Sequence, residues 1–224
     1  CIVAFDPANG WNHRFVPVDP QVIKNQTEAT LACWDIDAVK IGMLGTVPAI
    51  DATAEILSQN NFPHVVVDPV LICKGQEAGA ALDIDNALRE KILPLATVLT
   101  PNLFETETLS GMENISTVEE LTEAAKRIAD SGAKAVLVKG GANLPGDNAV
   151  DVLWDGHEAT VYSAPKVGDL RVSGAGDSLA AALTAELAKG KDLHAAVRAA
   201  KDFVTHGIAQ LLDAGTPFGV VWQS

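Results

Sequence analysis

The sequence has few cysteines, few basic residues and no long apolar run. Its 224 residues include three cysteines, and 16 Lys and Arg stand against 29 Asp and Glu, for a formal net charge of −13. This balance disfavours nucleic-acid binding, because phosphate backbones are held chiefly by Lys and Arg. No apolar run approaches the roughly 20 residues that span a bilayer. We therefore expect neither a nucleic acid nor a membrane among the partners.

The three cysteines, Cys1, Cys33 and Cys73, are odd in number and lack the spacing of a metal site. Packing as small hydrophobic side chains in a reducing cytoplasm is their simplest interpretation, so we expect a cytoplasmic protein. The chain opens with CIVAFDP, without Met, in the middle of a strand-like run. We therefore expect further residues before Cys1 in the natural protein.

Short apolar runs alternate with helical patterns along the whole chain, and 48% of the residues are hydrophobic, which is ample for one core. We expect strands at 1–5, 37–42, 64–68, 97–100 and 134–140. We expect helices near 19–33, 47–60, 84–93, 102–110 and 117–131, and mostly helix over 175–211. Continuous apolar strands that alternate with helices predict an α/β fold with three layers, αβα, around a mostly parallel central sheet.

Two local patterns predict details of this fold. Ser116 followed by Glu119 has the spacing of a capping box, which predicts the start of the helix near 117–131. Residues 149–163 form two strand-like runs around Asp155-Gly156, which predicts a hairpin with a type I′ turn at the sheet edge.

Polar residues end several of the expected strands. They are Lys40, Asp68, Asn102 and Lys139, and Glu105 lies one helical turn beyond Asn102. Each could be an ordinary helix cap, turn residue or solvated lysine. In parallel sheets, however, ligands bind beyond the carboxyl ends of the strands, and two carboxylates, one amide and one lysine together suit magnesium and phosphate. These residues therefore predict a magnesium–phosphate site.

The stretch GAGDS, residues 174–178, leads directly into an Ala- and Leu-rich helical segment. One interpretation is a plain helix start capped by Asp177 or Ser178. The other uses the same geometry for chemistry, because free N–H groups at a helix N-terminus bind anions and glycines allow close approach of a phosphate. Asp177 could then accept a proton from an attacking hydroxyl. The stretch is not a P-loop, since it lacks G-x-x-x-x-G-K-[ST].

Taken together, five motif blocks resemble the ribokinase superfamily. GAGDSLAAAL resembles its G-[TA]-G-[DC] signature, and LTPNLFETETLSG (99–111), VVVDPVLICKG (65–75), VKIGMLGT (39–46) and VLVKGG (136–141) follow the order of its vitamin-kinase branch. The opening AFDPANGWNHRFVPVD (4–19) is most similar to the bacterial pyridoxine and pyridoxal kinases of that branch. The resemblance covers essentially the whole chain and implies a single ribokinase-like domain over residues 1–224.

The resemblance implies roles for the residues that match its motifs. Asp177 would be the catalytic base, and the backbone of Gly174, Ala175 and Gly176 would form the anion hole with it. ATP would be bound by Asn102, Lys139, Gly140 and Ser173, with the tail at 215–222 beside the adenine. Magnesium would be held by Glu105 and Asp68. The vitamin would be bound by Gly42, Met43, Val70, Cys73, Trp11 and His13.

The chain also departs from the family pattern. The family's N-terminal strand and its glycine-rich GSDS-x-GAG-like substrate segment are absent from residues 1–224. The fourth anion-hole residue, often Cys in the most similar kinases, is Asp177, so thiol chemistry is not carried over. GDLRVS (168–173) replaces an expected Thr-His pair. His13 could equally be a surface residue of a polar loop, and Cys73 a packing residue.

These features predict an ATP-dependent kinase of B6-vitamer alcohols. The alternatives are a hydroxymethylpyrimidine kinase, an enzyme that carries out both reactions, and a ligand-binding relative without catalysis. A sugar kinase fits the motifs less well. The resemblance also suggests a homodimer and allows a monovalent cation beside the Mg²⁺–ATP.

Overall fold

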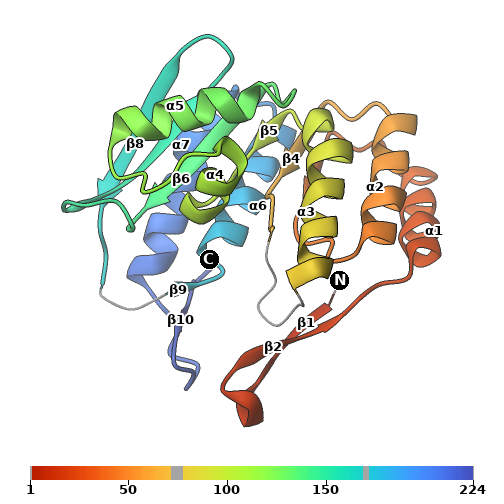
Figure 1. Ribbon diagram of the computed structural model, residues 1–224, viewed down its shortest axis with the longest axis horizontal. Coiled ribbons are helices and arrows are strands. Elements are labelled where there is room, and N and C mark those ends of the chain that lie inside the picture. Colours follow the sequence, from red (N-terminus) through yellow and green to blue (C-terminus); the bar gives the residue numbers. More distant parts are fainter. Residues whose placement is uncertain (1, 72–77, 169–171, 224) are drawn as a thin grey trace.

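The computed structural model describes residues 2–71, 78–168 and 172–223 (Figure 1). Its largest sheet has six strands in the order β3-β4-β5-β6-β7-β8. Neighbouring strands from β3 to β6 are parallel, whereas β7 and β8 are added antiparallel at one edge. These strands are β3 (Ala38–Ile41), β4 (His64–Val67), β5 (Val98–Leu99), β6 (Ala135–Gly141), β7 (Asn148–Trp154) and β8 (Ala159–Pro165).

Helices cover both faces of this sheet, so the expected three-layer α/β fold is confirmed (Figure 1). One face is covered by α2 (Val47–Gln59), α3 (Ala78–Lys91), α4 (Leu103–Ser110) and α5 (Val118–Ala129), and α1 (Pro20–Leu31) packs beside α2. The other face is covered by α6 (Ala175–Ala188) and α7 (Leu193–Ala209). Among the described residues, no helix is long and apolar enough to cross a membrane.

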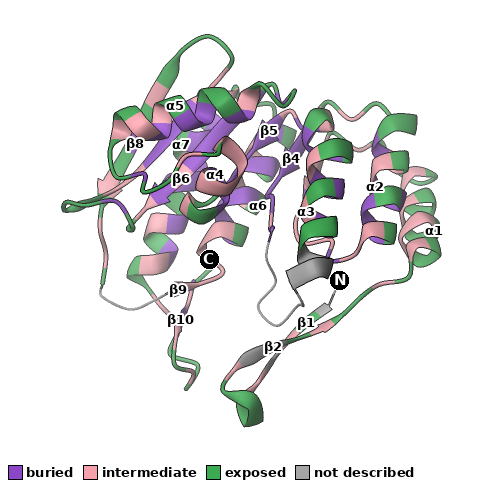
Figure 2. Cartoon of the chain, viewed as in Figure 1, coloured by how far each residue is buried: buried purple, intermediate pink, exposed green. Residues whose placement is uncertain are grey.

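The central strands are largely buried (Figure 2), and their side chains alternate between two cores. Val65 and Val67 belong to the cluster under α2–α5, whereas Val66 lies between them on the opposite face, against α6 and α7. Val136 and Leu137 divide in the same way on β6. Burial on both faces explains why these strands read as continuous apolar runs instead of alternating ones.

The first predicted strand is present, but its expected place in the central sheet is wrong. β1 (Ile2–Asp6) pairs antiparallel with β2 (Asn12–Val16) as a separate hairpin. The connection explains the difference, because Asp6 caps a short 3₁₀ turn at Pro7–Asn9 and Gly10 has a φ of 60°. This left-handed position reverses the chain within a few residues, so β2 returns along β1.

The predicted capping box is shifted by one residue. The N-cap of α5 is Thr117, whose side chain accepts from the backbone N–H of Glu120, and Glu120 completes the box. Ser116 also donates its backbone N–H to Glu120. Either register satisfies the sequence pattern, and the observed one turns Leu121, Ala124, Ala125 and Ile128 into the core. Helix α3 likewise begins at Ala78, earlier than expected.

The hairpin at the sheet edge is confirmed, but its turn is not the predicted type I′. Four residues, 155–158, connect Trp154 to Ala159, whereas a type I′ hairpin has a two-residue loop. The Asp155 carboxylate accepts the backbone N–H groups of His157 and Glu158, both at 2.8 Å. Asp155 therefore stabilises a longer turn through its side chain.

Replacing Asp155 by Ala should lower the melting temperature in a pH-dependent way. Hydrogen bonds, first from the Glu158 and then from the His157 backbone, lower the pKa of Asp155 to about 2. The carboxylate stabilisation is therefore complete above the ordinary pKa of about 4 and is lost as the pH falls toward 2. We expect a loss of about 1 kcal/mol, or roughly 2–4 °C, at pH 7 and a smaller one at pH 3, measured by calorimetry. An equal loss at both pH values would contradict this account.

Candidate active site

The carboxyl ends of four neighbouring strands meet at one edge of the sheet. The Asp68 N–H donates to Ile41, and the Lys139 N–H donates to Pro101, both at 2.8 Å. Asn102 forms a bridge with Lys139. Helix α6 packs against β3 and β4, which places its N-terminus at this edge. The prediction that the strand-end polar residues lie together is therefore confirmed.

The glycine turn opens helix α6 without a side-chain cap. Gly174 is the N-cap, with a φ of 82°, and it gives the first turn no side-chain cap. Neither Asp177 nor Ser178 is therefore the capping residue. By the geometry of an α-helix, the N–H groups of Ala175, Gly176 and Asp177 have no intrahelical acceptor. This turn is a suitable site for an anion such as a phosphate.

A buried ion pair joins β4 to β6 across the end of β5. Lys139 Nζ lies 2.6 Å from Asp68 Oδ1, and the two side chains are 11% and 6% exposed. The same oxygen accepts a hydrogen bond of 3.1 Å from Thr100. A Cβ at Gly176 would lie 3.2 Å from Lys139 Nζ. Gly176 therefore leaves room for the ammonium group beside the first turn of α6.

Asn102 and Glu105 begin helix α4 with a capping box. The Asn102 side chain accepts from the Glu105 N–H at 2.9 Å, and the Asn102 N–H donates to Glu105 at 2.7 Å. The interpretation of Asn102 as a helix cap is thus correct, and its contact with a nucleotide remains a prediction. Burial raises the pKa of Glu105 to about 7, with a further contribution from Asp68 against the opposing charge of Lys139.

The two predicted metal ligands, Asp68 and Glu105, flank Lys139 closely enough to affect one another electrostatically. Within the described part of the chain, no group of three His, Cys, Asp or Glu side chains could hold a metal. Magnesium needs few protein ligands when a nucleotide supplies phosphate oxygens. A divalent cation would also favour the ionised form of buried Glu105. These residues therefore fit a magnesium ion bound together with a nucleotide.

Asp177 lies in the first turn of α6 and faces Lys40, which extends from β3. Asp177 Oδ1 is 3.5 Å from Lys40 Nζ, and the carboxylate side chain is 70% exposed whereas the lysine is 25% exposed. The exposed carboxylate is accessible to a substrate hydroxyl. Sequence reasoning noted Lys40 as a strand-end residue but did not assign it to the site.

A second buried ion pair supports the strand that carries Lys139. Asp151 Oδ2 lies 2.6 Å from Lys201 Nζ of α7, and its Oδ1 accepts the Gly141 N–H at 3.0 Å. The register of β6 shifts between Lys139 and Gly141, so Asp151 fixes the backbone of this bulge. Sequence reasoning missed this pair, because a lysine within an amphipathic helix usually lies on its solvated face.

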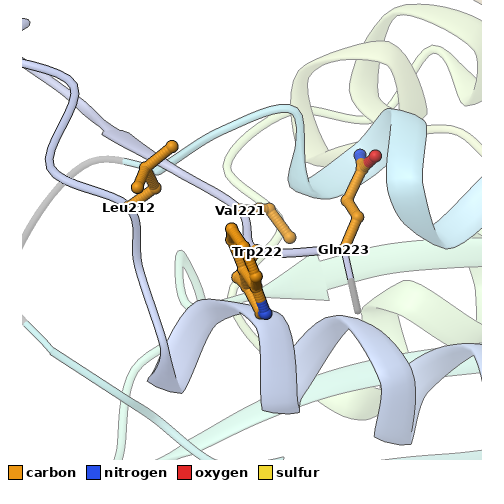
Figure 3. A pocket seen from close by; sticks show the side chains of 4 residues that line it. All are labelled: Leu212, Val221, Trp222 and Gln223. Atoms are coloured by element: carbon orange, nitrogen blue, oxygen red, sulfur yellow. The ribbon is translucent and has the colours of Figure 1, made fainter.

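The C-terminal segment lines a cavity that is open to solvent. The cavity has a volume of about 280 Å³ and is lined by Leu212, Val221, Trp222 and Gln223 (Figure 3). Gln223 extends toward α6 and donates to Ser178 at 2.8 Å. The Trp222 carbonyl passes so close to Gly207 that a Cβ there would lie 2.2 Å from its oxygen. The tail is therefore held against α6 and α7, where the adenine wall was expected.

The predicted vitamin-binding residues lie in several segments. Gly42 and Met43 follow β3, and Val70 follows Asp68, at the same sheet edge as the charged residues. Cys73 lies outside the described residues. Ser173, predicted to bind ATP, lies in β9 (Val172–Ser173), which pairs in parallel with β10 (Gly219–Val220).

Trp11 and His13 belong to the β1–β2 hairpin. The Trp11 ring meets the Phe218 ring edge-on, with centroids 6.0 Å apart, so the hairpin tip reaches the segment before β10. His13 is described through its backbone, which pairs with Phe5. Contact of these two residues with a vitamin ring remains a prediction.

The Lys139–Asp68 pair predicts distinct effects on stability and activity. In Lys139→Met, Asp68 stays buried without its counter-charge, so we expect a loss of about 3–5 kcal/mol in unfolding free energy. The double variant Lys139→Met/Asp68→Asn should recover much of this stability, measured by urea unfolding. It should not recover ATP-dependent turnover, because the lysine that is predicted to contact the ATP phosphates is still missing. Lys91→Met, which removes an exposed ion pair, is the control and should cost less than about 1 kcal/mol. Recovery of turnover in the double variant would contradict a role for Lys139 in the site.

A parallel sheet with an open helix N-terminus, two lysines and a carboxylate at its carboxyl edge is the arrangement of an α/β phosphotransferase. The chain belongs to the phosphomethylpyrimidine kinase family, whose model matches residues 1–222. This confirms the resemblance to ribokinase-like vitamin kinases.

Similar proteins include both kinds of vitamin kinase. The chain is 44% identical to a pyridoxine kinase of Bacillus subtilis, over 93% of this chain and 77% of that protein. It is 38% identical to a hydroxymethylpyrimidine/phosphomethylpyrimidine kinase of Haemophilus influenzae, over 91% and 76% of the two chains. The solved ADP complex of the Bacillus subtilis pyridoxal kinase superposes with a TM-score of 0.93 at 41% identity, covering 99% of this chain and 83% of that one.

Proposed function

We propose that this chain is an ATP-dependent kinase of the B6 vitamers. It transfers the γ-phosphoryl group of ATP to the hydroxymethyl group of pyridoxal, pyridoxine or pyridoxamine and produces the 5′-phosphate. The observation that carries the proposal is Asp177 in the uncapped first turn of α6, in a chain 44% identical to a pyridoxine kinase. A carboxylate beside an anion-binding turn is what phosphoryl transfer to an alcohol requires.

Asp177 is the general base in this proposal. Its exposed carboxylate accepts the hydroxyl proton as the substrate oxygen attacks the γ-phosphorus. The N–H groups of Ala175, Gly176 and Asp177 point from the helix N-terminus toward the phosphoryl oxygens and stabilise their charge. Because the base and these donors share one helical turn, they hold the acceptor and the phosphoryl group in a fixed relation.

The nucleotide lies along the same edge. Lys139, Gly140 and Ser173 contact its phosphates together with Asn102, and the cavity formed by Leu212, Val221, Trp222 and Gln223 takes the adenine. Magnesium, when bound with ATP, neutralises phosphate charge, and Glu105 and Asp68 would hold it there. The proposal includes a homodimer, a monovalent cation as a possible activator and a cytoplasmic location, which rest on the sequence resemblance alone.

The alternative acceptor is hydroxymethylpyrimidine or its phosphate, as in thiamine synthesis. The relative from Haemophilus influenzae and the family description support it. The mechanism is unchanged, because both rings carry a hydroxymethyl group of similar reach. We favour the B6 vitamers because identity to the pyridoxine kinase is higher, 44% against 38%.

A coupled ADP-release assay on the natural full-length protein tests the proposal. With ATP and magnesium, we expect turnover of pyridoxal or pyridoxine to exceed that of hydroxymethylpyrimidine. Asp177→Asn should lower kcat by about 10²–10⁴-fold, the usual contribution of a general base, while calorimetry shows retained ATP binding. Asp202→Asn, on the exposed surface of α7, is the matched control and should behave like the wild type. Turnover of the pyrimidine alone would reassign the substrate. Full turnover by Asp177→Asn would remove Asp177 as the base.

A further inference from the structure

Lys40 is a charged side chain beside the proposed base and has no assigned role. It leaves the edge strand β3, and its Nζ lies 3.5 Å from Asp177 Oδ1. A Cβ at Gly42 would lie only 2.8 Å from that Nζ. The ammonium group therefore covers Gly42 and reaches across the strand end to the first turn of α6. The absence of a side chain at Gly42 is what allows this path.

Two lysines thus flank the same helical turn. Lys139 Nζ lies beside Gly176 and Lys40 Nζ lies beside Asp177, so two ammonium groups and the helix N-terminus converge. Their ion pairs differ in kind. Lys139 and Asp68 are buried and 2.6 Å apart, whereas Lys40 and the exposed Asp177 are 3.5 Å apart. A long contact to an exposed carboxylate is weak, so Lys40 can exchange its partner at little cost.

In the proposed reaction, protonation of Asp177 is the step at which Lys40 exchanges its partner. As the hydroxyl proton moves to Asp177, the carboxylate becomes neutral and attracts Lys40 less. A bond forms between the acceptor oxygen and the γ-phosphorus, the bond from that phosphorus to the leaving oxygen of ADP breaks, and ADP keeps the electron pair. Negative charge then lies on the phosphoryl oxygens and ADP, and Asp177 later releases its proton to water. Lys40 stays protonated throughout.

We propose that Lys40 is a further catalytic residue, whose ammonium group stabilises the transferring phosphoryl group as Asp177 takes up the proton. This inference rests on the proposed function. An interaction that strengthens in the transition state lowers the barrier, whereas one of equal strength in the ground state only tightens binding. Lys40 meets this condition. Its ammonium group is paired with the Asp177 carboxylate in the ground state, and this pairing weakens when Asp177 takes up the proton.

The test is a comparison of four variants in steady-state and single-turnover assays with ATP, magnesium and the preferred vitamer. Lys40→Met should lower kcat by about 10²–10³-fold, as for loss of one transition-state donor, with the KM for ATP changed by less than about threefold. Lys40→Arg keeps the charge with a different shape and should retain part of the activity. Gly42→Ala should displace the ammonium without removing it and should also lower kcat. Lys24→Met, which removes an exposed ion pair on α1, is the matched control and should have wild-type kinetics.

The outcomes separate this inference from the proposed function. A kcat of Lys40→Met within about threefold of wild type, while Asp177→Asn is inactive, would overturn the role of Lys40 and leave the kinase proposal intact. A raised KM with unchanged kcat would also overturn it, because Lys40 would then only bind substrate. Full turnover by Asp177→Asn would refute the base itself. If the melting curve of Lys40→Met shows that this variant does not fold, the inference is tested with Lys40→Arg and Gly42→Ala instead. Wild-type kcat in both of these variants would overturn the inference.

Discussion

The ion pair between Lys139 and Asp68 is the interaction on which the rest of the site depends. It connects β4 to β6 over the end of β5, and its burial makes the two charges interdependent. A Cβ at position 176 would lie 3.2 Å from Lys139 Nζ, so glycine avoids a tight contact there, and the charge of Asp68 contributes to the raised pKa of Glu105. The second buried pair, Asp151 with Lys201, fixes the backbone next to Lys139. The nucleotide edge is therefore held by charge pairs that span the sheet.

Helix α6 is the complementary element, because its first turn is left without a cap. Helix α5 begins with a capping box and α7 with an aspartate cap, whereas the capping box of α4 consists of Asn102 and Glu105, which are themselves predicted to bind the nucleotide and magnesium. At α6 the N-cap is Gly174, which has no side chain to cap the first turn. Glycine in place of a capping side chain costs roughly a few tenths of a kcal/mol, and an anion bound at the turn would satisfy the free N–H groups.

The sequence alone was sufficient for the part of the site that depends on topology. Asp68, Asn102 and Lys139 end parallel strands, and parallel strands end at one edge, so their proximity followed from the pattern of elements. The sequence was insufficient to predict ion pairs that depend on how far a side chain extends. The pairs of Lys139 with Asp68 and Lys201 with Asp151 join residues 71 and 50 positions apart, and no local pattern encodes either. The predicted place of the first strand was wrong for a related reason. Residues 1–5 have strand character in any sheet, and the turn at Gly10 pairs them with β2.

The two ion pairs at the edge have different strengths for a physical reason. Lys139 and Asp68 are almost fully shielded from water, so separating them would leave an uncompensated buried charge, and the pair is suited to hold a position. Lys40 faces a carboxylate that is 70% exposed, and water can solvate either partner if they part. The Lys139–Asp68 pair, which holds a fixed position, is therefore buried. The Lys40–Asp177 pair, which responds to a moving proton in the proposed reaction, lies near solvent. The first turn of α6 lies beside both lysines, so in the proposed reaction a fixed cation and a responsive one would act on a single phosphoryl group.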